Sequence, residues 1–278
     1  MNTDIKLVAL DLDRTTLNSE SHLSEVNRKA LIDAINNGVH VCIASGRAFD
    51  TLPEDVISVP GIEYAITSNG AAIYRIAGKE CLKSYLLTPS SVKTILDLTA
   101  NDTVTYEAFI KGQAFASTEY IRHPEKYGAT EHSLAYVKKT RLLKDDIKGF
   151  ILEHCHELDS LDIVVGDEEL KKDIMDRIRK ATDEVYMTSS ISQLLEISYK
   201  DAGKKSGVKF LTEYLGLSRE NVAAFGDADN DTDMIEYAGV GIAMENAAPH
   251  LKQIADHVTL HHDKDGVAYA FRNILNIC

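Results

Sequence analysis

Two aspartates one residue apart, Asp11 and Asp13, follow the short apolar run Leu7 to Leu10. Such a run is typical of a strand that is buried on both faces of a sheet. In an extended segment the side chains at i and i+2 point to the same side, so the two carboxylates would repel each other unless a cation lay between them. Mg²⁺ suits such a pair because it is a hard cation that prefers oxygen ligands. The pair therefore indicates a magnesium site at a strand end, and the alternative is a solvated turn that begins with Asp.

Three further stretches have the same form, an apolar run that ends in polar residues. They are 39–47, 64–70 and 222–231, which end in Ser45-Gly46-Arg47, Ser68-Asn69-Gly70 and Asp227-Ala228-Asp229-Asn230-Asp231. A strand, a helix and a second strand form a right-handed unit with parallel strands, so that Asp11 and Ser45 lie at one edge of the sheet. In open α/β sheets, ligands bind at the carboxyl ends of the strands. We therefore expect residues that are far apart in the sequence to share a site.

The acidic run from Asp227 to Asp233 allows two other interpretations. A calcium loop of the EF-hand type needs Gly at its sixth position and Glu at its twelfth, and these positions hold Thr232 and Ala238, so this interpretation fails. The run could also be a solvated helix start, because acidic residues favour helix N-termini. Asp227 follows Gly226 at a strand end, where the backbone can approach a ligand closely.

Two further features could bind phosphate. Ser45-Gly46-Arg47 lies between a strand and a helix, where a hydroxyl and free backbone N–H groups form a phosphate cradle; the alternative is a turn in which Ser45 caps the helix. Lys204 lies among Lys200, Lys205 and Lys209 and could simply belong to an ordinary helix start.

The four stretches in this order, together with Lys204, resemble the haloacid dehalogenase superfamily of phosphohydrolases, and most closely its Cof-type members of subclass IIB, which carry a large α/β cap. The resemblance covers nearly the whole chain. It implies an α/β fold, with a Rossmann-like core that contains a parallel sheet and with an inserted α/β cap domain. We expect residues 1–86 and 191–278 to form the catalytic core, and residues 87–190 to form the cap that determines substrate specificity.

The resemblance also implies roles for single residues. Asp11 would be the nucleophile that forms an aspartyl-phosphate, and Asp13 would protonate the leaving oxygen and later activate water. The cofactor would be Mg²⁺, and its ligands would come from Asp11, the Asp13 backbone carbonyl, Asp227 and Asp231, directly or through water. The phosphoryl oxygens would be held by Leu12, Ser45, Gly46, Lys204 and Asn230. By its spacing from Glu196-Ile197-Ser198 and from Asp227, Lys204 matches the phosphate-binding lysine of the family, whereas Lys205 does not.

The sequence departs from the family pattern near two of these residues. Arg14 stands where the family usually has Gly, and a positive φ at this position would strain a non-glycine residue. Arg14 could instead point into the cleft and bind an anionic substrate. Thr16 replaces a common Leu, and Lys205 replaces a common Gly. None of these changes removes a chemical group that the mechanism needs.

Hydrophobic periodicity predicts the elements that position these residues. In the core we expect strands and helices to alternate: strands at 7–10, 39–44, 64–68, 221–225, 239–243 and 257–260, and helices at 24–37, 204–215, 231–237, 249–255 and 266–274. In the insertion we expect a mixture: strands at 104–110, 113–117, 161–165, 185–188 and 194–198, and helices at 90–100, 144–158 and 167–182.

Composition limits the partners. The net charge of the 278-residue chain is -13, which argues against nucleic acid or an anionic membrane as the main partner. The residues Met1 to Asp4 lack the basic start of a signal peptide, and no apolar run approaches the length of a membrane span. The four cysteines are scattered and indicate reduced thiols in a cytoplasmic protein. For His154-Cys155-His156 and His261-His262 we expect no metal, since neighbouring positions on a helix do not share a face.

The sequence thus predicts an Mg²⁺-dependent phosphohydrolase of small phosphorylated metabolites, sugar phosphates in particular. One alternative is a phosphotransferase or mutase, which would return the phosphoryl group to an acceptor other than water. Another is a non-catalytic protein that binds a phosphorylated ligand in the same cleft, although the presence of Asp11, Asp13, Lys204 and Asp227 speaks against it. No feature of the sequence indicates an oligomeric state.

Overall fold

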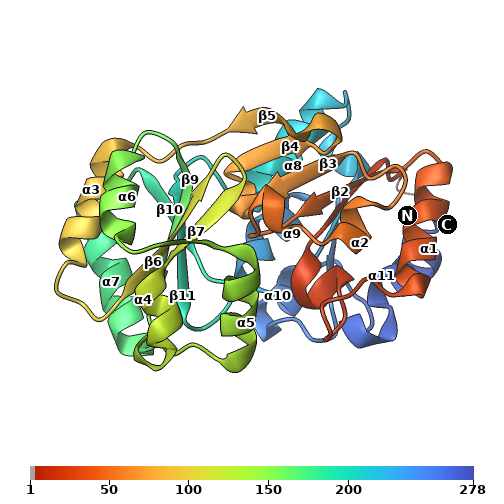
Figure 1. Ribbon diagram of the computed structural model, residues 1–278. Coiled ribbons are helices and arrows are strands. Elements are labelled where there is room, and N and C mark those ends of the chain that lie inside the picture. Colours follow the sequence, from red (N-terminus) through yellow and green to blue (C-terminus); the bar gives the residue numbers. More distant parts are fainter. Residues whose placement is uncertain (1–3) are drawn as a thin grey trace. The chain divides into compact units, whose positions relative to one another are not determined.

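The computed structural model describes residues 4–278, apart from the side chains of residues 132 and 133. The prediction about a signal peptide falls mainly on residues 1–3, which lie outside the described part. The chain forms two compact units (Figure 1). Unit 1 consists of the described residues up to Arg47, Leu52–Lys83 and Gly203–Cys278, and unit 2 consists of Ala48–Thr51 and Ser84–Ala202.

An eight-stranded sheet forms the centre of unit 1, in the order β14-β13-β12-β1-β2-β3-β4-β5. The pairs from β14 to β3 are parallel, and β4 pairs antiparallel with β3. All four residues of β1 are buried, as the apolar run predicted. The strands are β1 (Leu7–Leu10), β2 (His40–Ala44), β3 (Tyr64–Thr67), β4 (Ala72–Arg75), β5 (Glu80–Ser84), β12 (Val222–Gly226), β13 (Val240–Ala243) and β14 (His257–Val258).

The helices of unit 1 follow the predicted alternation with strands. The side chain of Ser24 accepts a hydrogen bond from the backbone N–H of Asn27, so Ser24 is the N-cap of the first helix, as expected. Asn27 is buried and its side-chain oxygen accepts a hydrogen bond from Ala268 N at 3.0 Å, which ties the first helix to the last. The helices are α1 (Glu25–Asn36), α2 (Glu54–Ile57), α8 (Lys204–Tyr214), α9 (Thr232–Tyr237), α10 (Pro249–Ile254) and α11 (Gly266–Asn273).

Unit 2 has a six-stranded sheet in the order β10-β11-β9-β6-β7-β8, antiparallel except for the pair β7–β8. Its strands are β6 (Thr105–Ile110), β7 (Gln113–Ser117), β8 (Leu142–Lys144), β9 (Leu158–Val164), β10 (Val185–Thr188) and β11 (Leu194–Tyr199). Its helices are α3 (Pro89–Leu98), α4 (Thr118–Arg122), α5 (Glu131–Thr140), α6 (Ile147–Glu153) and α7 (Glu168–Ala181). Buried residues of α3, α6 and α7 form one hydrophobic core with the sheet.

Unit 2 differs from the predicted insertion at its second boundary. The boundary predicted at residue 190 cuts off the strand at 194–198, which the sequence analysis grouped with the mixed segment, whereas β11 pairs with β9, with Glu196 opposite Asp162. Unit 2 therefore continues to Ala202. The predicted helix at 144–158 is wrong in its last turn, because α6 ends at Glu153 and β9 begins at Leu158. The reason is that β9 contains buried polar residues such as Asp159. Hydrophobic periodicity assigns a polar residue to a solvent-exposed position, so it did not indicate a buried strand that begins at Leu158.

The described residues contain no helix that is both long enough and apolar enough to span a membrane. The four cysteines are free thiols; Cys42 and Cys155 are buried.

Candidate functional site

The register of unit 1 brings the ends of three strands to one edge of the sheet. Leu10 is aligned with Ile43 of β2 and with Phe225 of β12, so the residues that follow these positions leave the sheet side by side. The next residue, Asp11, continues the ladder, since its N–H donates to Phe225 O at 3.1 Å. The edge therefore collects the polar ends of the stretches that the sequence analysis singled out.

The loop after β1 forms one wide turn, Leu12–Thr16. Leu17 N donates to Leu12 O at 2.9 Å, and the Thr16 hydroxyl donates to the backbone carbonyl of Asp11 at 2.6 Å. Within this turn Arg14 has φ 59 and ψ 16, the left-handed conformation in which a side chain is strained. The sequence analysis noted that a positive φ at this position would strain a non-glycine residue, and Arg14 does have a positive φ. Glycine would adopt this conformation without strain.

The ammonium group of Lys204 lies at the centre of the edge. Its Nζ donates to Asp11 Oδ1 and to Asp231 Oδ1, both at 2.6 Å, and the lysine side chain is fully buried. Lys204 is the first residue of α8, which sets its position next to the strand ends. Burial alone would lower the pKa of Lys204, but the two carboxylates outweigh it and hold this pKa above its ordinary value. Lys204 is therefore a permanent cation.

Three carboxylates lie close together beside this ammonium group. One oxygen each of Asp11, Asp227 and Asp231 lies within 4.8 Å of the others, and all three residues are buried. Burial is the main reason that the pKa of Asp11 lies well above its ordinary value, against the opposing effect of Lys204, and burial together with Asp231 raises the pKa of Asp227 to about 7. The neighbouring carboxylates contribute to both raised pKa values, so a bound cation would relieve their mutual repulsion, and the donors are all oxygen atoms. This donor set fits a divalent hard cation such as Mg²⁺.

Asp231 differs from the other two in how its oxygens are used. Oδ1 accepts from Lys204, and Oδ2 accepts from the backbone N–H groups of Asp227 and Ala228 at 2.9 and 3.0 Å. Asp231 therefore fixes both the lysine and the loop that carries Asp227. Asp227 Oδ1 accepts a hydrogen bond from the Thr15 hydroxyl at 3.3 Å. The other carboxylate oxygen, Oδ2, lies 3.7 Å from Arg14 Nε.

The Asp13 side chain does not join this cluster. Both of its oxygens are bound by Arg47, through Nε at 2.9 Å and Nη2 at 2.6 Å, in a bidentate pair. Asp13 is half-exposed, whereas little of the Arg47 side chain is exposed. The sequence analysis named Arg47 only as part of a motif; its fork geometry and its place directly after Ser45-Gly46 could have suggested a carboxylate partner.

The predicted phosphate-binding residues lie at the same edge. Ser45 is buried and its hydroxyl accepts from Arg47 N at 3.2 Å, and Asn230 is buried beside Asp231. The Asn230 amide donates to Asn69 Oδ1 at 3.0 Å, which links the loop after β12 to the loop after β3. Asn69 has a left-handed backbone (φ 52). Sequence reasoning quoted Asn69 without giving it a role, and the Asn-Gly pair after a strand was the available signal.

Close backbone contact explains two glycines near Lys204. A Cβ on Gly70 would lie 1.9 Å from Gly203 O, and a Cβ on Gly203 would lie 2.6 Å from Asp233 Oδ2. Both glycines also have positive φ, 88 and 125. Asp233 accepts from Lys205 N at 3.2 Å and so holds the first turn of α8. These contacts fix where Lys204 enters the cluster.

Three of the four histidines for which we expected no metal have protein partners. His262 Nδ1 lies 3.0 Å from the Leu17 carbonyl, and His261 Nδ1 accepts from Asp263 N at 3.2 Å. Asp263 in turn accepts from the backbone N–H and the hydroxyl of Ser19. His154 Nδ1 lies 3.1 Å from Glu157 Oε2.

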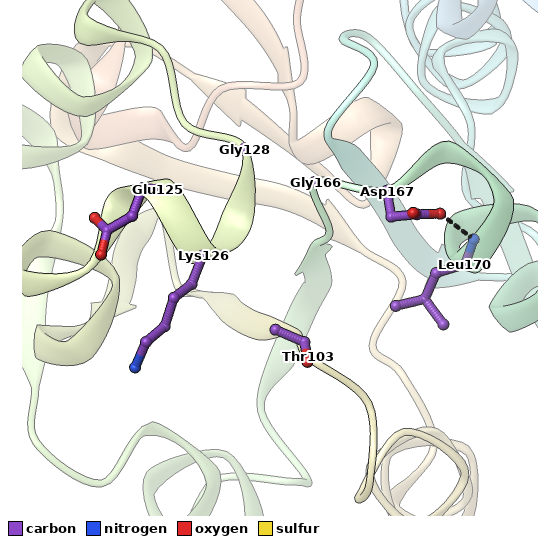
Figure 2. A pocket seen from close by; sticks show the side chains of 7 residues that line it. All are labelled: Thr103, Glu125, Lys126, Gly128, Gly166, Asp167 and Leu170. Atoms are coloured by element: carbon purple, nitrogen blue, oxygen red, sulfur yellow. Dashed lines mark hydrogen bonds between the residues drawn. The ribbon is translucent and has the colours of Figure 1, made fainter.

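A hollow of about 420 Å³ lies within unit 2 (Figure 2). It is lined by Thr103, Glu125, Lys126, Gly128, Gly166, Asp167 and Leu170. The Asp167 side chain is the N-cap of α7 and accepts from Leu170 N at 2.8 Å, and Lys126 pairs with Glu119. The side chains of Asp167 and Lys126 thus bind neighbouring groups of unit 2. The strand ends of unit 1 are therefore the better candidate site.

The chain is similar to known proteins over nearly its whole length. The model of the haloacid dehalogenase-like hydrolases matches residues 8–271. The 5-amino-6-(5-phospho-D-ribitylamino)uracil phosphatase YcsE of Bacillus subtilis is 30% identical, over 98% of this chain and 96% of its own length. A solved haloacid dehalogenase-like hydrolase from B. subtilis is 28% identical, with a TM-score of 0.82 over 98% of this chain and all of its own. A subclass IIB sugar phosphatase shares the fold, with a TM-score of 0.83 at 20% identity over 98% of this chain and all of its own.

Proposed function

Because this chain belongs to the haloacid dehalogenase-like hydrolases, as a Cof-type phosphatase, we propose that it is an Mg²⁺-dependent hydrolase of small phosphorylated metabolites, of subclass IIB. The observation that carries the proposal is the position of Asp11. Its carboxylate lies at a strand end, is bound by a buried lysine, and shares a cluster of oxygen donors with Asp227 and Asp231. A phosphate group would find there a nucleophile and positive charge in an otherwise acidic protein.

Asp11 acts as the nucleophile. One of its carboxylate oxygens attacks phosphorus, the bond from phosphorus to the leaving oxygen breaks, and Asp13 gives its proton to that oxygen. An aspartyl-phosphate results. In the second step Asp13 takes a proton from water, the water oxygen attacks phosphorus, and the bond to Asp11 breaks, so that inorganic phosphate and the free carboxylate are formed. Each Asp13 oxygen accepts a hydrogen bond from Arg47 in this structure, so one of these bonds must be released before Asp13 carries the proton of the first step, while the other keeps the carboxyl group oriented.

The metal ligands would be Asp11, the Asp13 backbone carbonyl and Asp227, with Asp231 orienting Asp227 and Lys204 rather than offering a free oxygen. Bound there, Mg²⁺ would offset the repulsion between the Asp11 carboxylate and the phosphate. The phosphoryl oxygens would be held by Lys204, by Ser45, by Asn230 and by backbone N–H groups at Leu12 and Gly46. Phosphoryl transfer depends mainly on such positioning and charge stabilisation.

Sugar phosphates and related phosphorylated polyols are the proposed substrate class. The support is that YcsE is named as a phosphatase of a phosphoribitylamino compound, and that a structural relative is named as a sugar phosphatase. We further propose that unit 2, the structural counterpart of the expected cap at 87–190, selects the leaving group, because the core residues would contact only the phosphoryl group that all candidates share. We place the protein in the cytoplasm, as the free cysteines suggested.

The test is a panel of phosphate esters, including sugar phosphates, 5-amino-6-(5-phospho-D-ribitylamino)uracil and acetyl phosphate, assayed for release of inorganic phosphate. The wild type should release phosphate with Mg²⁺ and not with EDTA, and Asp11→Asn should be inactive with an unchanged circular dichroism spectrum. Full activity in EDTA would contradict the metal, and activity of Asp11→Asn would contradict the nucleophile. Transfer of the phosphoryl group to an added sugar in preference to water would favour the phosphotransferase.

A further inference from the structure

A side chain that none of the motifs includes connects two loops of the candidate site. Asn246 lies in the turn between β13 and α10, in unit 1. Its Nδ2 is 2.8 Å from the backbone carbonyl of Arg14 and 3.4 Å from Asp227 Oδ2. An amide nitrogen has two hydrogens, one for each of these acceptors. Asn246 thus spans from the turn after β1 to the carboxylate after β12.

The orientation of this amide is fixed from its other side. His262 N donates to Asn246 Oδ1 at 3.1 Å, so the oxygen faces His262 and the nitrogen faces Arg14 and Asp227. His262 is buried, and its Nδ1 lies 3.0 Å from the Leu17 carbonyl, at the far end of the turn after β1. Because a backbone carbonyl can only accept, His262 Nδ1 is the donor in this contact. Asn246 and His262 together hold the turn, at its middle residue and at its end.

The turn needs such support because Arg14 is in the left-handed conformation. A non-glycine residue adopts this conformation only where surrounding contacts enforce it. The hydrogen bond from Asn246 reaches the carbonyl of this same residue. Loss of this bond would let the turn relax and would change the distance between its backbone oxygens and Asp227.

We propose that Asn246 is a positioning residue of the metal site, which sets the separation between the turn after β1 and the Asp227 carboxylate. This inference depends on the proposed function, in which the Asp13 carbonyl and Asp227 both serve as ligands. Mg²⁺ requires near-octahedral geometry at short distances, so it is sensitive to the placement of its ligands. Hydrogen bonds to the ligand groups from outside the coordination sphere typically change metal affinity by about 10–100-fold.

The test compares Asn246→Ala with the matched control Asn37→Ala. Asn37 also uses its amide nitrogen to bind a backbone carbonyl, that of Ile277, at 3.0 Å, and has no contact with the site. Mg²⁺ binding is measured by isothermal titration calorimetry without substrate, and the free energy of unfolding is measured by urea titration in EDTA. We expect the Kd for Mg²⁺ to rise about 10–100-fold in Asn246→Ala and to stay unchanged in Asn37→Ala. Asn246→Ala should lose more stability than Asn37→Ala, because Asn246 is half-buried and makes three hydrogen bonds whereas Asn37 is exposed, so the urea titration must first show that both variants are folded under the conditions of the calorimetry.

A second readout separates positioning from general damage. If Asn246 acts through the metal, kcat of Asn246→Ala should recover toward the wild-type value when Mg²⁺ is raised to saturation. An unchanged Kd in Asn246→Ala would overturn the inference while leaving the proposed function intact. A wild type that binds no Mg²⁺ would instead overturn the metal in the proposed function, and the inference with it.

Discussion

Lys204 Nζ lies 2.6 Å from Asp11 Oδ1, and the lysine side chain has no exposed surface. Asp231 binds the same ammonium at the same distance. Each of these groups would be costly to bury alone, so the stability of this edge of unit 1 and the proposed reactivity of Asp11 depend on the same pair. A single lysine therefore links folding to the proposed chemistry.

Lys204→Met should both destabilise the protein and abolish turnover. Methionine has a similar length without charge, so Asp11 and Asp231 would remain buried without a counter-ion. Removal of one partner of a buried pair costs about 3–5 kcal/mol. Urea unfolding in EDTA measures this loss. Lys205→Met is the control, since Lys205 is exposed, and equal stability of the two variants would contradict the account.

Arg47→Lys should lower kcat with little change in stability. Lysine keeps the charge but cannot form the bidentate contact to Asp13, so the Asp13 carboxylate would lose its fixed orientation. A displacement of this kind can reduce turnover by about 100-fold. Steady-state kinetics on one phosphate ester give the number. Arg75→Lys, which alters the exposed ion pair with Glu80, should leave kcat at the wild-type value; a similar fall there would remove the argument for Asp13.

Gly70→Ala should destabilise unit 1 far more than Gly38→Ala. Both glycines have positive φ, 88 and 82, but a Cβ at position 70 would lie 1.9 Å from Gly203 O whereas nothing lies within 4 Å at position 38. Gly38→Ala should lose about 1 kcal/mol from backbone strain alone. The additional loss of stability in Gly70→Ala measures the clash between the new Cβ and Gly203 O. Comparable thermal unfolding of the two variants would show that the backbone at α8 is not packed as described.

Asp159→Asn should change how the free energy of unfolding depends on pH. Burial raises the pKa of Asp159 to about 6, and Oδ2 has no hydrogen-bond partner within the described residues. Because the folded pKa lies above the unfolded value of about 3.9, the protonated form favours folding. This contribution is complete below pH 4 and is lost as the pH rises through 6.

The wild type should therefore lose up to about 3 kcal/mol from this group between pH 4 and pH 7, and the variant should not. The difference between the two urea-unfolding curves, measured at each pH, isolates Asp159 from other carboxyls such as Asp162. Curves that stay parallel across this range would contradict the raised pKa.

Much of the fold could be predicted because its signals are local. The buried run before Asp11, the cap at Ser24 and the alternation of strands and helices are properties of short segments, and parallel strands place their carboxyl ends at one edge. The family resemblance joined Lys204, Asp227 and Asp231 to Asp11 in one hypothesis, and the structure places these four side chains together. Their catalytic roles stay predictions.

The parts that sequence reasoning missed depend on contacts between distant segments. The boundary of unit 2 shifted because β11 pairs with β9, and nothing in an isolated apolar segment specifies its partner strand. The Arg47–Asp13 pair depends on where two loops leave the sheet. Asn246 contacts both Arg14 and Asp227, and its contact with Arg14 is to a residue with a left-handed backbone conformation. The residue type arginine does not indicate this conformation.

The most direct test of the account is to trap the covalent intermediate on Asp11. The enzyme is mixed with a good phosphate ester and Mg²⁺, quenched with borohydride during turnover, digested, and analysed by mass spectrometry. Borohydride reduces an aspartyl-phosphate to homoserine, so the peptide that contains position 11 should carry homoserine there, and only when substrate and Mg²⁺ are both present. Rapid turnover with unmodified Asp11, or homoserine at a different aspartate, would contradict the central claim.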